Sequence, residues 1–200
     1  MSGWIKICGM NSAESVAAAL EAGADAIGFV FASSVRRVTP ERAAELARGA
    51  RRRVTCVAVT QHPSQAEVDE IERGFQPDLL QTDIEDYAGL KVPRRLMRLP
   101  VLRTTHPPFA DYPPRLLFEG AHSGSGAASD WQQAAVLARR TKLILAGGLH
   151  AGNVADAIRQ VRPYGVDTSS GVEARPGVKS AARIEEFVQA ARAAFREMLI

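Results

Sequence analysis

Cysteine is scarce in this chain: two cysteines, Cys8 and Cys56, occur among 200 residues, and no Cys-x-x-Cys pair is present. The sequence therefore excludes a disulfide framework and gives no support for a zinc site. Long apolar runs are also missing. None approaches the ~20 residues that cross a bilayer, and no charged segment followed by an apolar one opens the chain. We expect a cytoplasmic protein with reduced thiols and no membrane partner.

Aromatic residues make up only 6% of the chain, and no run of Lys and Arg is interleaved with them. This argues against a nucleic-acid partner. The charges nearly balance, with 25 Lys and Arg against 22 Asp and Glu, so the net charge of +3 gives mild attraction for a small phosphorylated ligand. With 46% hydrophobic residues, residues 1–200 can form one domain around one sizeable core.

Short β-rich runs alternate with helical patterns along the whole chain. Helix starts are predicted where Asn11 with Glu14 and Ser64 with Glu67 have capping-box spacing, and where Thr39 precedes a proline. The predicted strands cover residues 4–8, 26–31, 54–59, 78–81, 99–103, 115–119, 142–146 and 165–169.

Eight strands with helical crossovers indicate an α/β protein with a parallel sheet, which closes most economically as a (β/α)8 TIM barrel. An open doubly wound sheet is the alternative. The chain is short for a barrel, and the shortening falls on the fourth and fifth helices. Residues 82–95 are too few for a full helix, and the proline-rich segment 104–114 cannot form an ordinary crossover helix.

Active sites of such barrels form where the strands end at their carboxyl side. Cys8 ends the first predicted strand, although a lone cysteine is more often a buried apolar residue, and Cys56 in mid-strand is expected to pack. Glu119 ends the sixth strand after an apolar run, which favours a raised pKa and an acid role. Asp83 ends the fourth strand and is expected to cap a turn, and His122 is expected to face solvent.

Small residues follow the last two strands. Amides in such loops can approach a phosphate closely, so these loops predict an anion site. The second strand is followed by Arg36 and Arg37, which could clamp a carboxylate or phosphate or could simply be solvated. The residues of the two loops are Gly147, Gly148, Ser169, Ser170 and Gly171.

Five blocks of sequence, taken together, resemble the phosphoribosylanthranilate isomerase family of tryptophan biosynthesis. They are KICGM, GFVFASSVRRV, SGSGAASDW, LAGGLHAGNV and GVDTSSGVEARPGVK, in this order between residue 5 and about residue 187. The resemblance implies a (β/α)8 barrel that needs no cofactor or metal. It also implies an acid/base Amadori rearrangement of N-(5-phosphoribosyl)anthranilate to 1-(2-carboxyphenylamino)-1-deoxyribulose 5-phosphate.

The resemblance also assigns roles to residues. It makes Cys8 the general base and Glu119 the general acid, and it assigns the anthranilate carboxylate to Arg37. The remaining substrate-binding set is Gly147, Gly148, Asp167, Ser169, Ser170 and Gly171. Relatives in the family are monomers or dimers, so the resemblance implies a monomer or a homodimer.

Three positions depart from the family's pattern. The Gln-Leu-His-Gly block after the fourth strand reads Gln-Thr-Asp-Ile, so its histidine is replaced by Asp83. The acid is Glu119 instead of aspartate, and Ser180 replaces the aspartate of a Lys-Asp pair. Two alternatives therefore stay open. A barrel enzyme acting on a related phosphoribosyl amine is favoured if Asp83 and His122 line the pocket and Arg37 does not, and a non-catalytic phosphosugar-binding paralogue is favoured if Glu119 points away from Cys8.

Overall fold

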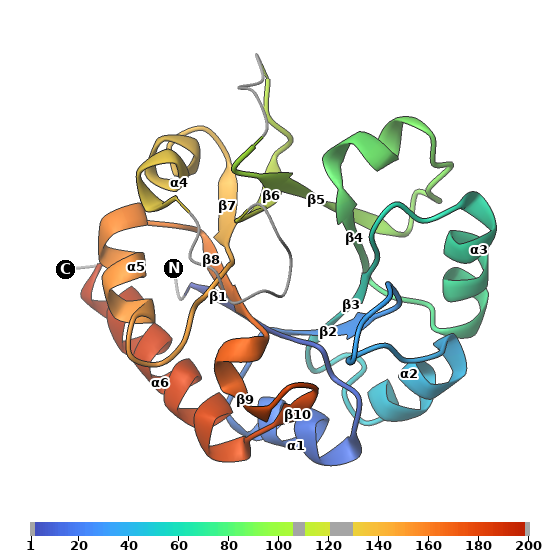
Figure 1. Ribbon diagram of the computed structural model, residues 1–200, viewed down its shortest axis with the longest axis horizontal. Coiled ribbons are helices and arrows are strands. Elements are labelled where there is room, and N and C mark those ends of the chain that lie inside the picture. Colours follow the sequence, from blue (N-terminus) through green and yellow to red (C-terminus); the bar gives the residue numbers. More distant parts are fainter. Residues whose placement is uncertain (1–2, 106–110, 121–129, 199–200) are drawn as a thin grey trace.

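The computed structural model describes residues 3–105, 111–120 and 130–198, so His122 and the glycine-serine run beside it lie outside the described residues. Eight parallel strands close into a barrel in chain order (Figure 1), which confirms the predicted TIM barrel. The strands are β1 (Trp4–Cys8), β2 (Ala26–Val30), β3 (Thr55–Val59), β4 (Leu79–Asp83), β5 (Met97–Arg103), β6 (Arg115–Glu119), β7 (Lys142–Leu145) and β8 (Gly165–Thr168).

Six α-helices pack around the described part of the barrel. They are α1 (Ala13–Glu21), α2 (Pro40–Ala47), α3 (Gln65–Gly74), α4 (Trp131–Ala138), α5 (Val154–Val161) and α6 (Ala181–Glu197). The predicted caps of α2 and α3 are confirmed, because the Thr39 and Ser64 hydroxyls each accept a backbone amide of the first turn. The predicted start of α1 was wrong by one residue. Ser12 caps it with Ser15, because the Asn11 side chain instead donates to the carbonyl of Gly177 at 2.8 Å.

The fourth and fifth crossovers are reduced, as predicted. A 3₁₀ turn, η1 (Ile84–Ala88), follows β4, and the described residues between β5 and β6 contain no helix. The barrel wall on this side carries a groove of about 740 Å³ that includes Leu79, Tyr87 and Pro114. This groove begins near the amino ends of β4 and β5, away from the strand ends that carry Cys8 and Glu119.

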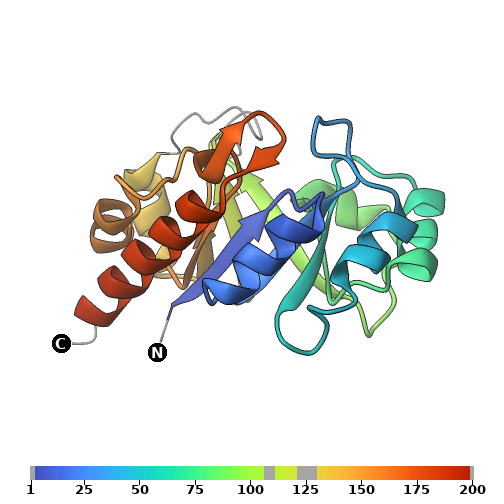
Figure 2. The same ribbon diagram turned by 90° about the horizontal axis from the view of Figure 1, so that it is seen from below.

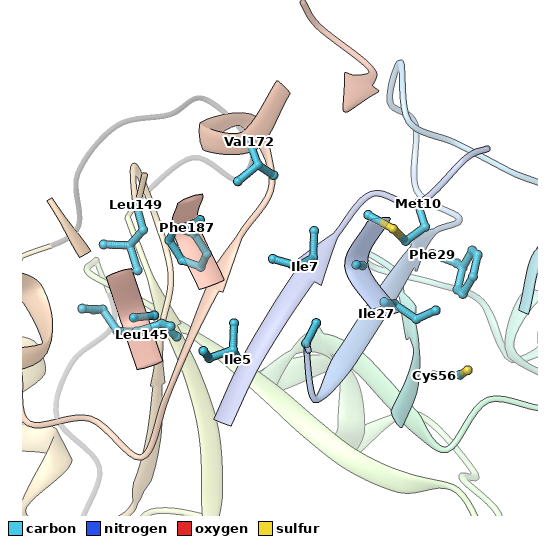
Figure 3. Close-up of a cluster of buried hydrophobic side chains, with 14 of the residues drawn as sticks. Ile5, Ile7, Met10, Ile27, Phe29, Cys56, Leu145, Leu149, Val172 and Phe187 are labelled. Atoms are coloured by element: carbon cyan, nitrogen blue, oxygen red, sulfur yellow. The ribbon is translucent and has the colours of Figure 1, made fainter. Parts of the chain in front are cut away.

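Apolar side chains form two layers because successive residues of a strand point to opposite faces of the sheet. Ile5 and Ile7 point outward and lie in the cluster that Phe187 of α6 joins (Figure 3). The inner layer fills the barrel with Ala26, Val57, Leu79, Leu99, Val101, Leu117, Ile144 and Ala146. The same alternation turns Lys6 and Cys8 of β1 into the barrel.

The mouth of the barrel carries a short 3₁₀ turn, η2 (Ser170–Val172), and a hairpin of β9 (Glu173–Arg175) and β10 (Val178–Lys179). Figure 2 shows this hairpin and the loop after β2 at one end of the barrel, with both chain termini toward the other. Ser180, one of the three departures, caps α6 by accepting the amide of Arg183, which is a role that aspartate also fills. Among the described residues, no helix combines the length and apolar character needed to cross a membrane.

Candidate active site

Cys8 is the last residue of β1, and its side chain points into the barrel with the residue 7% exposed. Its neighbour on β2 is Gly28, which leaves the space that the thiol uses. A Cβ on Gly28 would lie 3.0 Å from Cys8 Sγ and 3.3 Å from Lys6 Nζ, so a larger residue would crowd both groups. The chain then turns at Gly9, whose amide donates to the Gly28 carbonyl at 2.9 Å. This geometry places a thiol at the mouth.

Lys6 precedes Cys8 by two residues on β1, so its side chain points to the same face of the strand, and it is fully buried. Its ammonium donates to the Asp167 carboxylate of β8 at 2.8 Å. Burial favours the neutral amine, but the Asp167 carboxylate and the Cys8 thiol outweigh it and raise the pKa of Lys6. Burial also raises the pKa of Cys8, and the Lys6 and Lys179 charges only partly offset it. A buried ion pair therefore underlies the thiol.

Glu119 ends β6 and belongs to the same inward-facing set, since Leu117 two residues earlier is in the inner core layer. Its carboxylate accepts from Arg103 Nη1 at 2.7 Å, and its side chain is 13% exposed. In the order of the barrel, β6 is three strands from β1. Glu119 and Cys8 thus project into the same mouth from nearly opposite walls.

Arg103 also binds Asp83, with Nη2 2.6 Å from Oδ1. The expectation that Asp83 caps a turn was wrong: it makes no side-chain capping bond to η1 and its inward-facing carboxylate is only 2% exposed. Burial raises the pKa of Asp83 although Arg103 opposes this. His62, from the loop after β3, lies beside it, with Nε2 3.6 Å from Asp83 Oδ2 and Nδ1 2.9 Å from Asp86 Oδ1. A histidine therefore stands next to the position where the family's histidine is missing, but it comes from a different loop.

The structure brings Arg36, and not Arg37, to Cys8. Arg36 Cδ lies 2.7 Å from where a Cβ on Gly9 would be, and the charge of Arg36 interacts with Cys8. Arg37 is exposed and lines a surface pocket with Glu67. Its charge helps to lower the pKa of the Glu67 carboxyl. Arg37, to which the sequence analysis assigned the substrate carboxylate, therefore does not lie beside the thiol, and Arg36 does. Adjacent residues in this loop point in different directions, and the pattern of two arginines does not show which one faces inward.

Arg36 is held by Glu173 through two hydrogen bonds, from Nε at 2.6 Å and from Nη2 at 2.8 Å. Lys179 donates to the same carboxylate at 2.9 Å and to the carbonyl of Ser169 at 2.8 Å. Burial acts in the opposite direction, but the Arg36 and Lys179 hydrogen bonds lower the pKa of Glu173 to about 2. Ser169 completes the chain of contacts, because its hydroxyl donates to the Cys8 carbonyl at 3.1 Å. The hairpin is thereby fastened to the end of β1.

The loops after β7 and β8 lie against each other. The Thr168 hydroxyl donates to the Leu149 carbonyl at 2.7 Å, and a Cβ on Gly171 would overlap that same carbonyl oxygen. Only glycine allows this approach. Among the described residues, no hydrogen bond uses the amides of Gly147, Gly148, Ser170 or Gly171 as donors. Amides of this kind can donate to an anion, and the anion site at this pair of loops stays a prediction.

Cys56 lies on β3 in the outer core layer near Phe29 (Figure 3). It is fully buried, and burial raises its pKa to about 11. The prediction that Cys56 packs is confirmed. Sequence reasoning missed Lys6, Arg103 and Lys179 as parts of the site. A signal was present for Lys6: a lysine stands between isoleucines in a strand that is otherwise apolar.

A family model described as N-(5'-phosphoribosyl)anthranilate (PRA) isomerase matches residues 5–190. A PRA isomerase of Pseudomonas paraeruginosa is 41% identical over 205 residues, covering 96% of this chain and 97% of that protein. One of Mesorhizobium japonicum is 39% identical over 214 residues, covering 95% of each. This chain belongs to the PRA isomerase family. The alternative fold, an open sheet, is excluded by the closed barrel.

Solved structures of the family agree in fold. A phosphoribosylanthranilate isomerase of Thermus thermophilus superposes with a TM-score of 0.82 at 30% identity, covering 95% of this chain and 98% of that chain. Another family structure, in complex with reduced 1-(o-carboxyphenylamino)-1-deoxyribulose 5-phosphate, has a TM-score of 0.79 at 28% identity over 96% and 99% of the two chains. The name of that relative's ligand includes a phosphate and a carboxyphenyl group.

Proposed function

We propose that this chain converts N-(5-phosphoribosyl)anthranilate into 1-(2-carboxyphenylamino)-1-deoxyribulose 5-phosphate. The observation that carries the proposal is that Cys8 and Glu119 face one mouth from opposite walls, in a chain that belongs to the PRA isomerase family. A thiol and a carboxyl in this arrangement can act on two atoms of one sugar. The reaction is inferred from membership of the family, and Cys8 and Glu119 are proposed as its base and its acid.

The reaction begins at the ring oxygen of the ribose. Glu119 gives its proton to that oxygen, the bond from C1 to the oxygen breaks, and the nitrogen lone pair forms an iminium. Cys8 as thiolate then removes the proton from C2, and the released electron pair forms an enolamine that tautomerises to the ketone. Arg103 stabilises the carboxylate that Glu119 becomes. Positioned acids and bases each typically contribute ~10²–10⁴-fold.

The substrate is held by its two charged ends. The amides of Gly148, Ser170 and Gly171 would bind the phosphate. Arg36 would bind the anthranilate carboxylate, since Glu173 occupies its Nε and Nη2 and leaves the Nη1 donors for a ligand. Two fixed ends orient the sugar between acid and base, which can supply a large part of the rate enhancement.

The two alternatives, an enzyme for a related phosphoribosyl amine and a non-catalytic paralogue, depend on where Asp83, Arg37 and Glu119 lie. Asp83 does face the barrel interior and Arg37 does not, as the related-amine enzyme would require, whereas His122 lies outside the described residues. Arg36 nevertheless takes the place of Arg37, so the carboxylate of anthranilate keeps a partner. A non-catalytic paralogue is disfavoured, because Glu119 faces the mouth as Cys8 does.

Turnover of the natural substrate tests the proposal directly. The purified chain is given freshly generated phosphoribosylanthranilate, and the loss of its anthranilate-type fluorescence is followed beside a PRA isomerase of known activity. We expect catalysed loss of fluorescence in proportion to the protein added. Absence of turnover by folded protein, under conditions where the reference enzyme works, would exclude the proposed reaction.

Arg36→Leu and Arg37→Leu form a matched pair for the carboxylate site. A charge-assisted hydrogen bond is worth about 1.5–3 kcal/mol, so Arg36→Leu should raise KM by about tenfold to a hundredfold. Arg37→Leu should leave KM nearly unchanged, because Arg37 lies beside Glu67 outside the mouth. Steady-state kinetics of the two variants decide the question. A larger KM for Arg37→Leu would return the role to Arg37.

The ligand class, the assembly state and the compartment complete the proposal. We infer a small phosphorylated ligand, a monomer or homodimer, and a cytoplasmic location. A Thermotoga maritima relative is described as a dimeric phosphoribosylanthranilate isomerase from which monomers were generated. Sedimentation of this chain at several concentrations would separate the two assembly states.

A further inference from the structure

Lys6 has no part in the reaction as written, yet it occupies the centre of the barrel directly below the base. It is 0% exposed, and its ion pair with Asp167 is buried on both sides. Lys6 Nζ and Cys8 Sγ both lie within 3.3 Å of the point where a Cβ on Gly28 would be. The ammonium therefore faces both the carboxylate and the sulfur.

A buried ion pair is a poor device for stability alone. Desolvation of the two charges offsets most of their attraction, and well-packed apolar residues of similar volume are often as stable or more so. At the level of Lys6 the inner layer is otherwise largely apolar, with Ala26 on β2, Val57 on β3 and Leu79 on β4. The pair of Lys6 and Asp167 is thus an exception that packing does not explain.

We propose that Lys6 is a positioning residue for the reaction: its ammonium, fixed by Asp167, holds and stabilises Cys8 as the thiolate that removes the C2 proton. This inference rests on the proposed function for its catalytic meaning. When Cys8 takes the proton, the thiol is neutral and the ammonium is left to the Asp167 carboxylate. The Lys6 ammonium therefore has an anionic partner both before and after Cys8 takes the proton.

Other charged groups near Cys8 either stabilise its thiolate, as Lys6 does, or destabilise it. Lys179 of β10 favours the thiolate, whereas Asp167 of β8 disfavours it. Arg36, from the loop after β2, adds positive charge, but Glu173 pairs with both Arg36 and Lys179. Gly28 of β2 adds none. Lys6 is the cation on the same strand as Cys8, and Asp167 is the anion that opposes it.

The two members of the pair can be changed separately with opposite expected effects. In a Cys56→Ala background, the rate of Cys8 alkylation by iodoacetamide is measured against pH by mass spectrometry, without any turnover. Lys6→Met removes the cation, so the alkylation midpoint should rise by about one pH unit or more. Asp167→Asn removes the anion and leaves the cation to the sulfur, so the midpoint should fall by a similar amount.

Opposite shifts would not arise from general disruption of the barrel, which would move both midpoints toward that of an exposed thiol. A midpoint that stays constant or falls in Lys6→Met overturns the proposal. Lys6→Met leaves a buried carboxylate unpaired, so thermal unfolding is measured beside it. If that variant does not fold, Asp167→Asn decides, with thermal unfolding near that of wild type as proof that the barrel is intact: a lower midpoint then supports the coupling, and an unchanged or higher one rejects it.

The same variants separate this inference from the function itself. If wild-type protein fails to turn over phosphoribosylanthranilate while the midpoints move as expected, the proposed reaction fails and the coupling of Lys6 to Cys8 stands. If turnover occurs and the midpoints do not move, the reverse holds. In an active enzyme, the alkaline shift of Lys6→Met should also appear in the pH profile of kcat/KM.

Discussion

Cys8→Ala should lower kcat/KM by about 10²–10⁴-fold, the contribution typical of a positioned general base. The variant keeps both substrate ends in place, because the phosphate loops and Arg36 are untouched, so KM should change little. Steady-state kinetics on phosphoribosylanthranilate measure both parameters. The substitution removes the sulfur and leaves a methyl side chain, so the Lys6 and Asp167 pair stays intact.

Cys56→Ala is the matched control for this experiment. It removes the other buried thiol, which lies in the outer layer beside Phe29. We expect kcat/KM within a few-fold of wild type. Full activity in Cys8→Ala, or equal losses in the two variants, would show that the thiol at the end of β1 is not the base.

The wild-type rate should also rise with pH while Cys8 ionises. Burial raises the pKa of the Cys8 thiol above its ordinary value, so the thiolate is a minority at neutral pH and gains population as pH increases. The profile of kcat/KM therefore gains on its alkaline side until the thiolate is complete. The rising limb should be lost in Cys8→Ala.

The barrel could be predicted because its signals are local. Short β-rich runs that alternate with helical patterns predicted all eight strands, and the short and proline-rich segments predicted the two reduced crossovers. The caps of α2 and α3 were readable for the same reason. The start of α1 could not be predicted in the same way, because the Asn11 side chain donates to the carbonyl of Gly177. Gly177 is distant in the sequence, so the residues around Asn11 give no sign of this contact.

The site could be predicted only at strand ends. Cys8, Glu119 and the glycine loops stand at strand ends, where barrels form their active sites, so position made them candidates and the family resemblance assigned their roles. Arg36 and Arg37 are consecutive, and the bend of a loop decides which one turns inward. Asp83, Arg103 and His62 come from three separate units, and only the closed barrel brings them together. Their network lies at the end of β4, where the histidine block of the family is missing from this sequence.

Glu119 carries the second large expected effect. Glu119→Gln keeps the size of the side chain and can still meet Arg103 through its amide oxygen, but it has no acidic proton to give to the ribose ring oxygen. We expect kcat/KM to fall by about 10²–10⁴-fold with little change in KM. Rapid mixing with freshly generated phosphoribosylanthranilate and the fluorescence readout measure the loss.

Glu119→Asp is the informative partner of that variant, because it restores the carboxyl that is usual in the family but shortens the reach by one methylene. A displacement of about one ångström can cost ~10²-fold, so this variant should be impaired yet more active than Glu119→Gln. Equal losses would mean that the position matters for its contact with Arg103 and not for its proton. If Glu119→Gln were fully active and Asp83→Asn inactive, the acid would be Asp83, whose buried carboxyl shares the same arginine and whose pKa is raised by burial.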